Sequence, residues 1–80
     1  MRDRAYCATG LYPSRPDRLK DAVIAELLIS GPEEVRSIHQ GIAKSLRKGV
    51  RLSRPELERL LESMEKAGFV QEASPSWLKK

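Results

Sequence analysis

The residue types that most often carry catalysis or bind metals are scarce in this chain of 80 residues. It holds one histidine, His39, and one cysteine, Cys7, far apart in the sequence. A zinc site usually needs four closely spaced ligands, so we expect no metal site and interpret His39 as a solvated or edge residue. The five glycines stand singly and form no phosphate-binding loop. We therefore expect neither an enzyme nor a cofactor, and a function in binding.

The positive charge of the chain is concentrated in one block. No acidic residue lies between Val35 and Pro55. The block contains Arg36, Lys44, Arg47, Lys48, Arg51 and Arg54, whereas glutamates dominate residues 56–72. Such blocks polarise the surface, and this one predicts an edge that binds a polyanion. Charge alone leaves a second interpretation open, in which the block is a solvated helix face.

Three amphipathic helices must position these charges. Apolar residues recur at three- and four-residue steps over residues 17–30, 33–48 and 54–67. This spacing places them on one face of a helix. Pro32 suits the first turn of the second helix, where it would bring Glu33 and Glu34 to the positive end of the helix dipole.

The third helix has the clearest start and stop signals. Ser53 and Glu56 have the spacing of a capping box, in which each side chain accepts the other's backbone N–H. Leu52 and Leu57 stand at the positions of a hydrophobic staple, and Gly68 is placed to end the helix.

The two ends of the chain give weaker signals. Residues 1–16 show no periodicity and are broken by glycine and proline, which predicts a flexible or docked arm before a domain of residues 17–80. Residues 69–73 and 77–78 predict two short strands about a turn.

Three helices, with a sharply capped third one that runs into a glycine and two apolar residues, resemble the winged helix-turn-helix family. The matching positions are Leu57, Leu60, Leu61, Met64, Gly68, Phe69 and Val70, and the resemblance covers residues 17–78. It implies a mainly α fold of three helices with a small C-terminal β-hairpin, the wing. Members of the family mostly bind duplex DNA with the third helix in the major groove.

The resemblance also implies contacts by position. Base or phosphate contacts would fall to Arg51, Ser53, Arg54 and Arg59, with Glu58 beside them. Phosphates would be held from the end of the second helix by Lys44, Arg47 and Lys48, and the wing would carry Ser74 and Ser76 with Lys79 and Lys80 behind.

These observations predict a small duplex-DNA-binding protein, such as a transcriptional regulator. The alternative is a protein-interaction module or subunit of a larger complex. It would bind through the acidic side of the third helix (Glu58, Glu62 and Glu65) or through the arm around Tyr6, Leu11 and Tyr12. A homodimer is compatible with either function.

The sequence also predicts a cytoplasmic protein that does not enter a membrane. The single cysteine has no disulfide partner in the chain, which is typical of a reducing compartment. We expect no signal peptide, because the stretch that follows the charged N-terminus is too short and too mixed in polarity. The longest apolar run, residues 22–28, is interrupted by Glu26 and is too short to span a bilayer.

Overall fold

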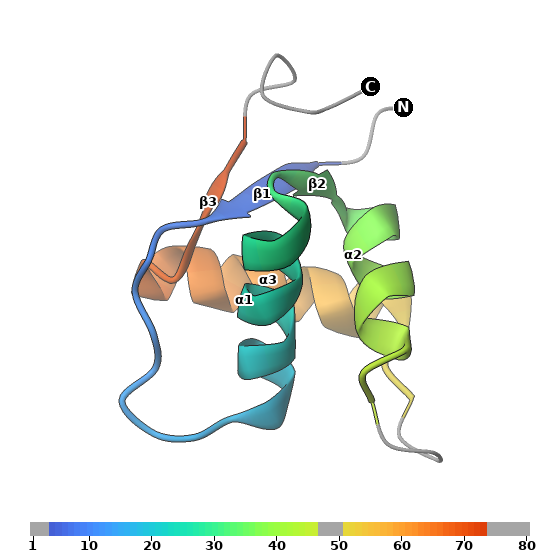
Figure 1. The fold of residues 1–80 in the computed structure, drawn as a ribbon, viewed down its shortest axis with the longest axis horizontal. Coiled ribbons are helices and arrows are strands. Elements are labelled where there is room, and N and C mark those ends of the chain that lie inside the picture. Colours follow the sequence, from blue (N-terminus) through green and yellow to red (C-terminus); the bar gives the residue numbers. More distant parts are fainter. Residues whose placement is uncertain (1–3, 47–50, 74–80) are drawn as a thin grey trace.

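A computed structural model describes residues 4–46 and 51–73. In chain order these residues form β1 (Ala5–Ala8), α1 (Arg18–Ser30), β2 (Glu33–Glu34), α2 (Val35–Ala43), α3 (Arg54–Ala67) and β3 (Val70–Glu72). The described part is mostly helical, with three helices and one small antiparallel sheet. The sheet lies above the helices in Figure 1, where α2 stands beside α1 and α3 runs crosswise behind α1.

The N-terminal strand β1 is the central strand of the sheet. The strand order is β2-β1-β3, and Tyr6 lies opposite both Glu33 of β2 and Glu72 of β3. The prediction that residues 1–16 hold no regular element is therefore wrong for residues 5–8. Because both neighbours of β1 lie far from it in sequence, no local signal marks this strand.

The predicted C-terminal hairpin is described only in part. Its first strand, β3, falls within the expected residues 69–73, but it pairs with β1. The expected second strand, at 77–78, lies outside the described residues, as do Ser74 and Ser76 of the expected wing.

Helices α1 and α3 occupy the segments that the sequence predicts. The carboxylate of Asp17 caps α1 by accepting hydrogen bonds from the backbone N–H groups of Leu19 and Lys20, both at 3.1 Å. The predicted capping box is present at the start of α3. Gly68 ends that helix in the left-handed conformation at φ 90°, which glycine adopts without strain.

Helix α2 is shorter than the predicted segment 33–48 at both ends. Residues 33 and 34 pair with β1, so the helix begins at Val35, and Glu34 makes no side-chain cap. After Ala43 the chain closes one more turn, in which Leu46 N–H donates to the Ile42 carbonyl at 3.0 Å. Gly49, which stands where the C-terminal cap of the predicted segment 33–48 would fall, lies outside the described residues.

One core joins the three helices to the inner face of the sheet. Its buried members are Tyr6, Val23, Ile24, Leu27, Val35, Ile38, Ile42, Leu57, Leu61, Met64 and Val70. They include Leu57 and Leu61, as the apolar spacing predicts. Leu28, which the same spacing placed in the stripe of α1, is instead half exposed. The core thus fixes which side of each helix remains outside.

Candidate functional site

The described residues of the predicted basic site all reach the surface. Those that are exposed are Lys44, Arg51, Ser53, Arg54 and Arg59. Arg47 and Lys48 lie outside the described residues. Arg36, which belongs to the same sequence block, is also exposed, in the first turn of α2.

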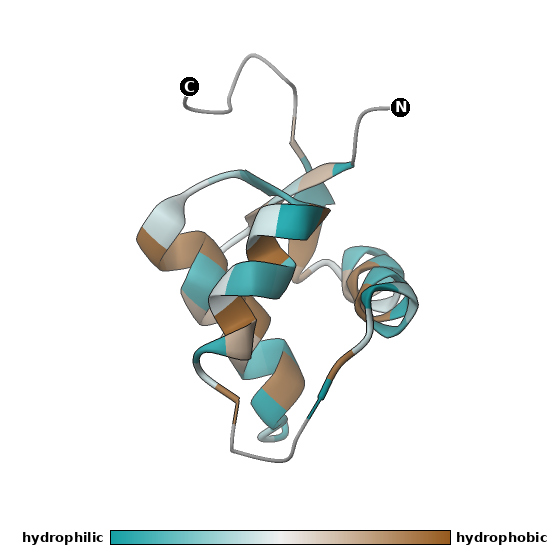
Figure 2. Cartoon of the chain, turned by 90° about the vertical axis from the view of Figure 1, so that its right-hand side faces the viewer, coloured by the Kyte–Doolittle hydropathy of each residue, from teal (hydrophilic) through white to brown (hydrophobic). Residues whose placement is uncertain are grey.

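The outer face of α2 is defined by what packs on its two sides. Toward α1, Gly41 lies so close to Glu26 that a Cβ on the glycine would overlap the Glu26 carboxyl group. Toward α3, the ring of His39 binds the segment that precedes that helix. Arg36, Gln40 and Lys44 follow each other at four-residue steps on the remaining, exposed side. Figure 2 looks onto this side of α2, with α1 to its left and α3 seen end-on to its right.

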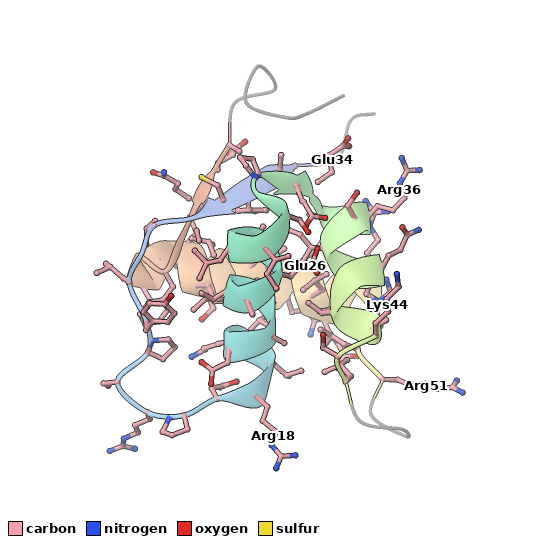
Figure 3. All side chains as sticks on the ribbon, viewed as in Figure 1. Arg18, Glu26, Glu34, Arg36, Lys44 and Arg51 are labelled. Atoms are coloured by element: carbon pink, nitrogen blue, oxygen red, sulfur yellow. The ribbon has the colours of Figure 1, made fainter. Side chains whose placement is uncertain are left out.

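Arg36 and Lys44, together with Arg51 of the segment before α3, form what we call the basic edge. Figure 3 shows all three on the side of the molecule that α2 occupies, with Arg36 and Arg51 pointing away from the body. Within the described residues, none of the three forms an ion pair with a carboxylate. Their charges therefore remain available to an anionic partner.

His39 fixes the position of the segment that carries Arg51. Its Nε2–H donates to the backbone carbonyl of Leu52 at 2.6 Å, which links α2 to the residues just before α3. His39 is half-buried, so the expectation of a solvated or edge residue described only part of its role. Beside this bond, Ile42, Leu46 and Arg51 help line an apolar hollow of about 330 Å³.

The N-terminus of α3 is closed by its own side chains. The Glu56 carboxylate accepts from the Ser53 backbone N–H at 3.2 Å and from the Ser53 hydroxyl at 2.7 Å. The Glu56 N–H donates to Ser53 Oγ at 3.4 Å. The bonds from Ser53 lower the pKa of Glu56, so a negative charge occupies this helix end at neutral pH.

The exposed side of α3 mixes both signs of charge. Arg54 Nε donates to Glu58 Oε1 at 3.3 Å in an ion pair. Arg54, a predicted DNA-contact residue, is thus paired with a carboxylate of its own helix. Farther along, Arg59 shares the exposed side with Glu62 and Lys66. This part of the predicted site therefore has little net positive charge, and the basic edge is confined to α2 and Arg51.

A pair of carboxyl groups meets where α1, β2 and α2 join. Burial raises the pKa of Glu33 to about 7, and the nearby Glu26 acts in the same direction. Glu26 accepts a hydrogen bond from the Ser30 hydroxyl at 2.9 Å. Two ionised carboxylates cannot form a hydrogen bond with each other, because neither has a proton to donate. A protonated Glu33 can donate a hydrogen bond to Glu26. We did not predict this pair from the sequence, because Glu33 and Glu34 were expected in the first turn of the second helix.

The three residues of the N-terminal arm that were expected to bind a protein partner divide into two kinds. Tyr6 is buried in the core, whereas Leu11 and Tyr12 are 58% and 59% exposed. Tyr6 is therefore unavailable to a protein partner. On α1, Leu28 and Ile29 are 52% and 84% exposed.

The part of the chain that the structure describes contains no group of three or more histidine, cysteine or acidic side chains that could hold a metal ion. No helix in it is long and apolar enough to cross a bilayer. Comparisons with protein-family models, with curated proteins and with solved structures gave no match.

Proposed function

We propose that this chain is a winged-helix domain that binds duplex DNA through the basic edge. The observation that carries the proposal is that Arg36, Lys44 and Arg51 lie along one exposed side and form no ion pair with an acidic residue among the described residues. Attraction to phosphates supplies most of the non-specific affinity of a protein for DNA, so a patch of this kind is the feature that such a function requires.

The arrangement of the elements supports the winged-helix part of the proposal. Helices α2 and α3 are consecutive and pack against each other, and strands flank the pair in sequence as β2 and β3. Strand β3, the first strand of the expected wing, pairs with β1, which takes the central place in the sheet. The sheet that packs on the helices is thus completed by the N-terminal strand β1.

The proposed function is tested by binding of a labelled random-sequence duplex, followed by fluorescence anisotropy as salt is raised. We expect binding at low salt and a steep loss with salt. The variant Lys44→Ala/Arg51→Ala should bind every duplex more weakly, and its salt slope should be smaller by about 0.9 for each phosphate contact removed.

A matched control removes the same number of positive charges elsewhere. Arg18 lies at the start of α1, a helix that carries no residue of the basic edge (Figure 3), and Lys66 is exposed near the end of α3. The variant Arg18→Ala/Lys66→Ala should therefore keep the salt slope of the unaltered protein. Equal losses in the two double variants would mean that only net charge matters, and the basic edge would not be the binding site.

A protein-interaction module is the second candidate function. It is favoured by the exposed pair Leu28 and Ile29 on α1 and by the exposed carboxylates of Glu58 and Glu62 on α3. Glu65, the third residue of the expected acidic face, is half-buried. Failure of the protein to bind duplex DNA even at low salt would favour this function over the first.

A further inference from the structure

We propose that α2, and not α3, is the helix that faces the duplex, and that it binds phosphates without reading the bases. This inference rests on the proposed function and specifies how the same basic edge works. It differs from the arrangement implied by the resemblance, in which the third helix enters the major groove.

The first observation is that the start of α3 is already occupied by an anion. In a reading helix, the N-terminal residues contact base edges and lie close to the backbone phosphates. Here the Glu56 carboxylate fills that position and is held by two hydrogen bonds from Ser53. A phosphate or base oxygen at this helix end would meet a negative charge.

The second observation concerns the side chains of the first two turns of α3. Arg54 is paired with Glu58, and Arg59 lies on the same exposed side as Glu62. Each carboxylate that approaches the DNA backbone opposes binding. The exposed side of α3 therefore lacks the excess of positive charge that would bring it into a groove.

The third observation is the geometry of α2. Arg36 lies in the first turn of α2, and Lys44 is the cap residue that follows the helix and keeps a helical conformation. The two are eight residues apart, so about 12 Å of helix axis separates them at 1.5 Å per residue. The major groove of B-DNA is also about 12 Å wide, so the two cations can reach the backbones on its two sides. Gln40 lies between them and can donate to a phosphate oxygen, while Arg51 extends the contact beyond the end of α2.

The outer face of α2 is held in place by contacts on both sides. Glu26 lies against Gly41 on the side of α1, and His39 is bonded to Leu52 on the side of α3. Long cationic side chains that project from a fixed helix fit a phosphate backbone of any sequence. We therefore infer that this domain binds duplex DNA with little preference among sequences.

The experiment is a binding selection from a randomised duplex library, performed with the unaltered protein and two double variants. Arg36→Ala/Lys44→Ala should bind all duplexes more weakly, with a salt slope smaller by about 0.9 per lost contact. Arg59→Ala/Glu62→Ala keeps the net charge and alters only the exposed side of α3. It should leave the affinity and the recovered sequences unchanged, and no motif should be enriched with any protein. Circular dichroism and urea melts establish that the variants remain folded.

Two results would overturn this inference while leaving the proposed function intact. One is an enriched sequence motif that disappears in Arg59→Ala/Glu62→Ala, because α3 would then read bases. The other is a single strand that binds as tightly as the duplex, since a fit across the groove requires two backbones. The absence of binding to any duplex at low salt would instead reject the proposed function itself, and this inference with it.

Discussion

At the residue scale, the start of α3 depends on Ser53. Replacement by alanine removes the oxygen that accepts the Glu56 N–H and the hydroxyl that binds the Glu56 carboxylate. We expect Ser53→Ala to lower the free energy of unfolding by about 1 kcal/mol, the usual cost of losing an N-cap serine. Urea melts measure this loss. Ser63→Ala, at an exposed position inside the same helix, is the control and should change little. Equal midpoints and slopes for Ser53→Ala and the unaltered protein would contradict the cap.

Glu33 gives the stability of the protein a distinctive pH dependence. Its pKa is raised from 4.5 to about 7 in the folded state, first by burial and then by Glu26. The folded state therefore binds more protons than the unfolded state between these values, and stability falls as the pH rises from about 4.5 to about 7. Above that range the protein carries the full cost of the buried charge.

The variant Glu33→Gln tests this dependence, because an amide keeps the shape and can donate to Glu26 at every pH. We expect a higher free energy of unfolding than that of the unaltered protein at pH 8. We also expect a smaller fall in stability between pH 5 and pH 8. Glu34→Gln removes a charge from the neighbouring residue of β2 and serves as the control. Urea melts at several pH values decide the matter, and parallel pH curves for Glu33→Gln and the unaltered protein would show that Glu33 is not the responsible group.

At the element scale, the contact between α1 and α2 depends on the absence of a side chain at Gly41. A glycine inside a helix lowers the free energy of unfolding by about 0.5–1 kcal/mol relative to an alanine at the same position. In the unaltered protein, the gain from Gly41→Ala should be reduced, since the new Cβ displaces the Glu26 carboxylate from its bond with Ser30. In the Glu26→Ala background the full gain should appear. A double-mutant cycle measures the difference, and additive effects would mean that the two residues do not interact.

The sequence predicts those elements whose signals are local. For α3, the bounds 54–67, the capping box and the terminal Gly68 are all confirmed. The predicted length of α2 was wrong because the apolar spacing continues to Leu46, whereas the helix ends at Ala43. The start of α2 is set by pairing of residues 33–34 with β1, which is a contact between distant parts of the chain.

Strand β1 is an element that carries no local signal in the sequence. Both of its faces are covered, with Tyr6 in the main core and Ala5 and Cys7 in a small cluster with Ala73. A strand buried on both faces has no alternation of polar and apolar residues. The sequence Ala5–Ala8 also lacks the β-branched residues that usually mark a strand.

At the scale of the whole molecule, β1 holds the sheet together. Strands β2 and β3 each pair with β1, and in the order β2-β1-β3 they are not neighbours. We expect that removal of residues 1–9 abolishes cooperative thermal unfolding, because the core loses Tyr6 and both edge strands lose their partner. Thermal denaturation followed by circular dichroism tests this. A cooperative transition close to that of the full chain would mean that residues 10–80 fold without the strand.

The candidate site was predictable in composition but not in arrangement. The acid-free block identifies Arg36, Lys44 and Arg51 as one group of charges. Their placement on one side follows from how α2 packs between α1 and α3, through Gly41 and His39, neither of which the sequence marked as important to the site. The ion pair between Arg54 and Glu58 likewise forms only in the folded helix.

The most direct test of the account is an NMR titration of the ¹⁵N-labelled protein with a random-sequence duplex at low salt, which maps the shifted backbone amides. We expect the largest shifts along α2 from Arg36 to Lys44 and at Arg51, with little change along the exposed side of α3 from Glu58 to Lys66. Addition of salt should reverse the shifts, because the contacts are to phosphates. Shifts that are largest along α3 would contradict the assignment of α2 as the helix that faces DNA. An unchanged spectrum would contradict DNA binding itself.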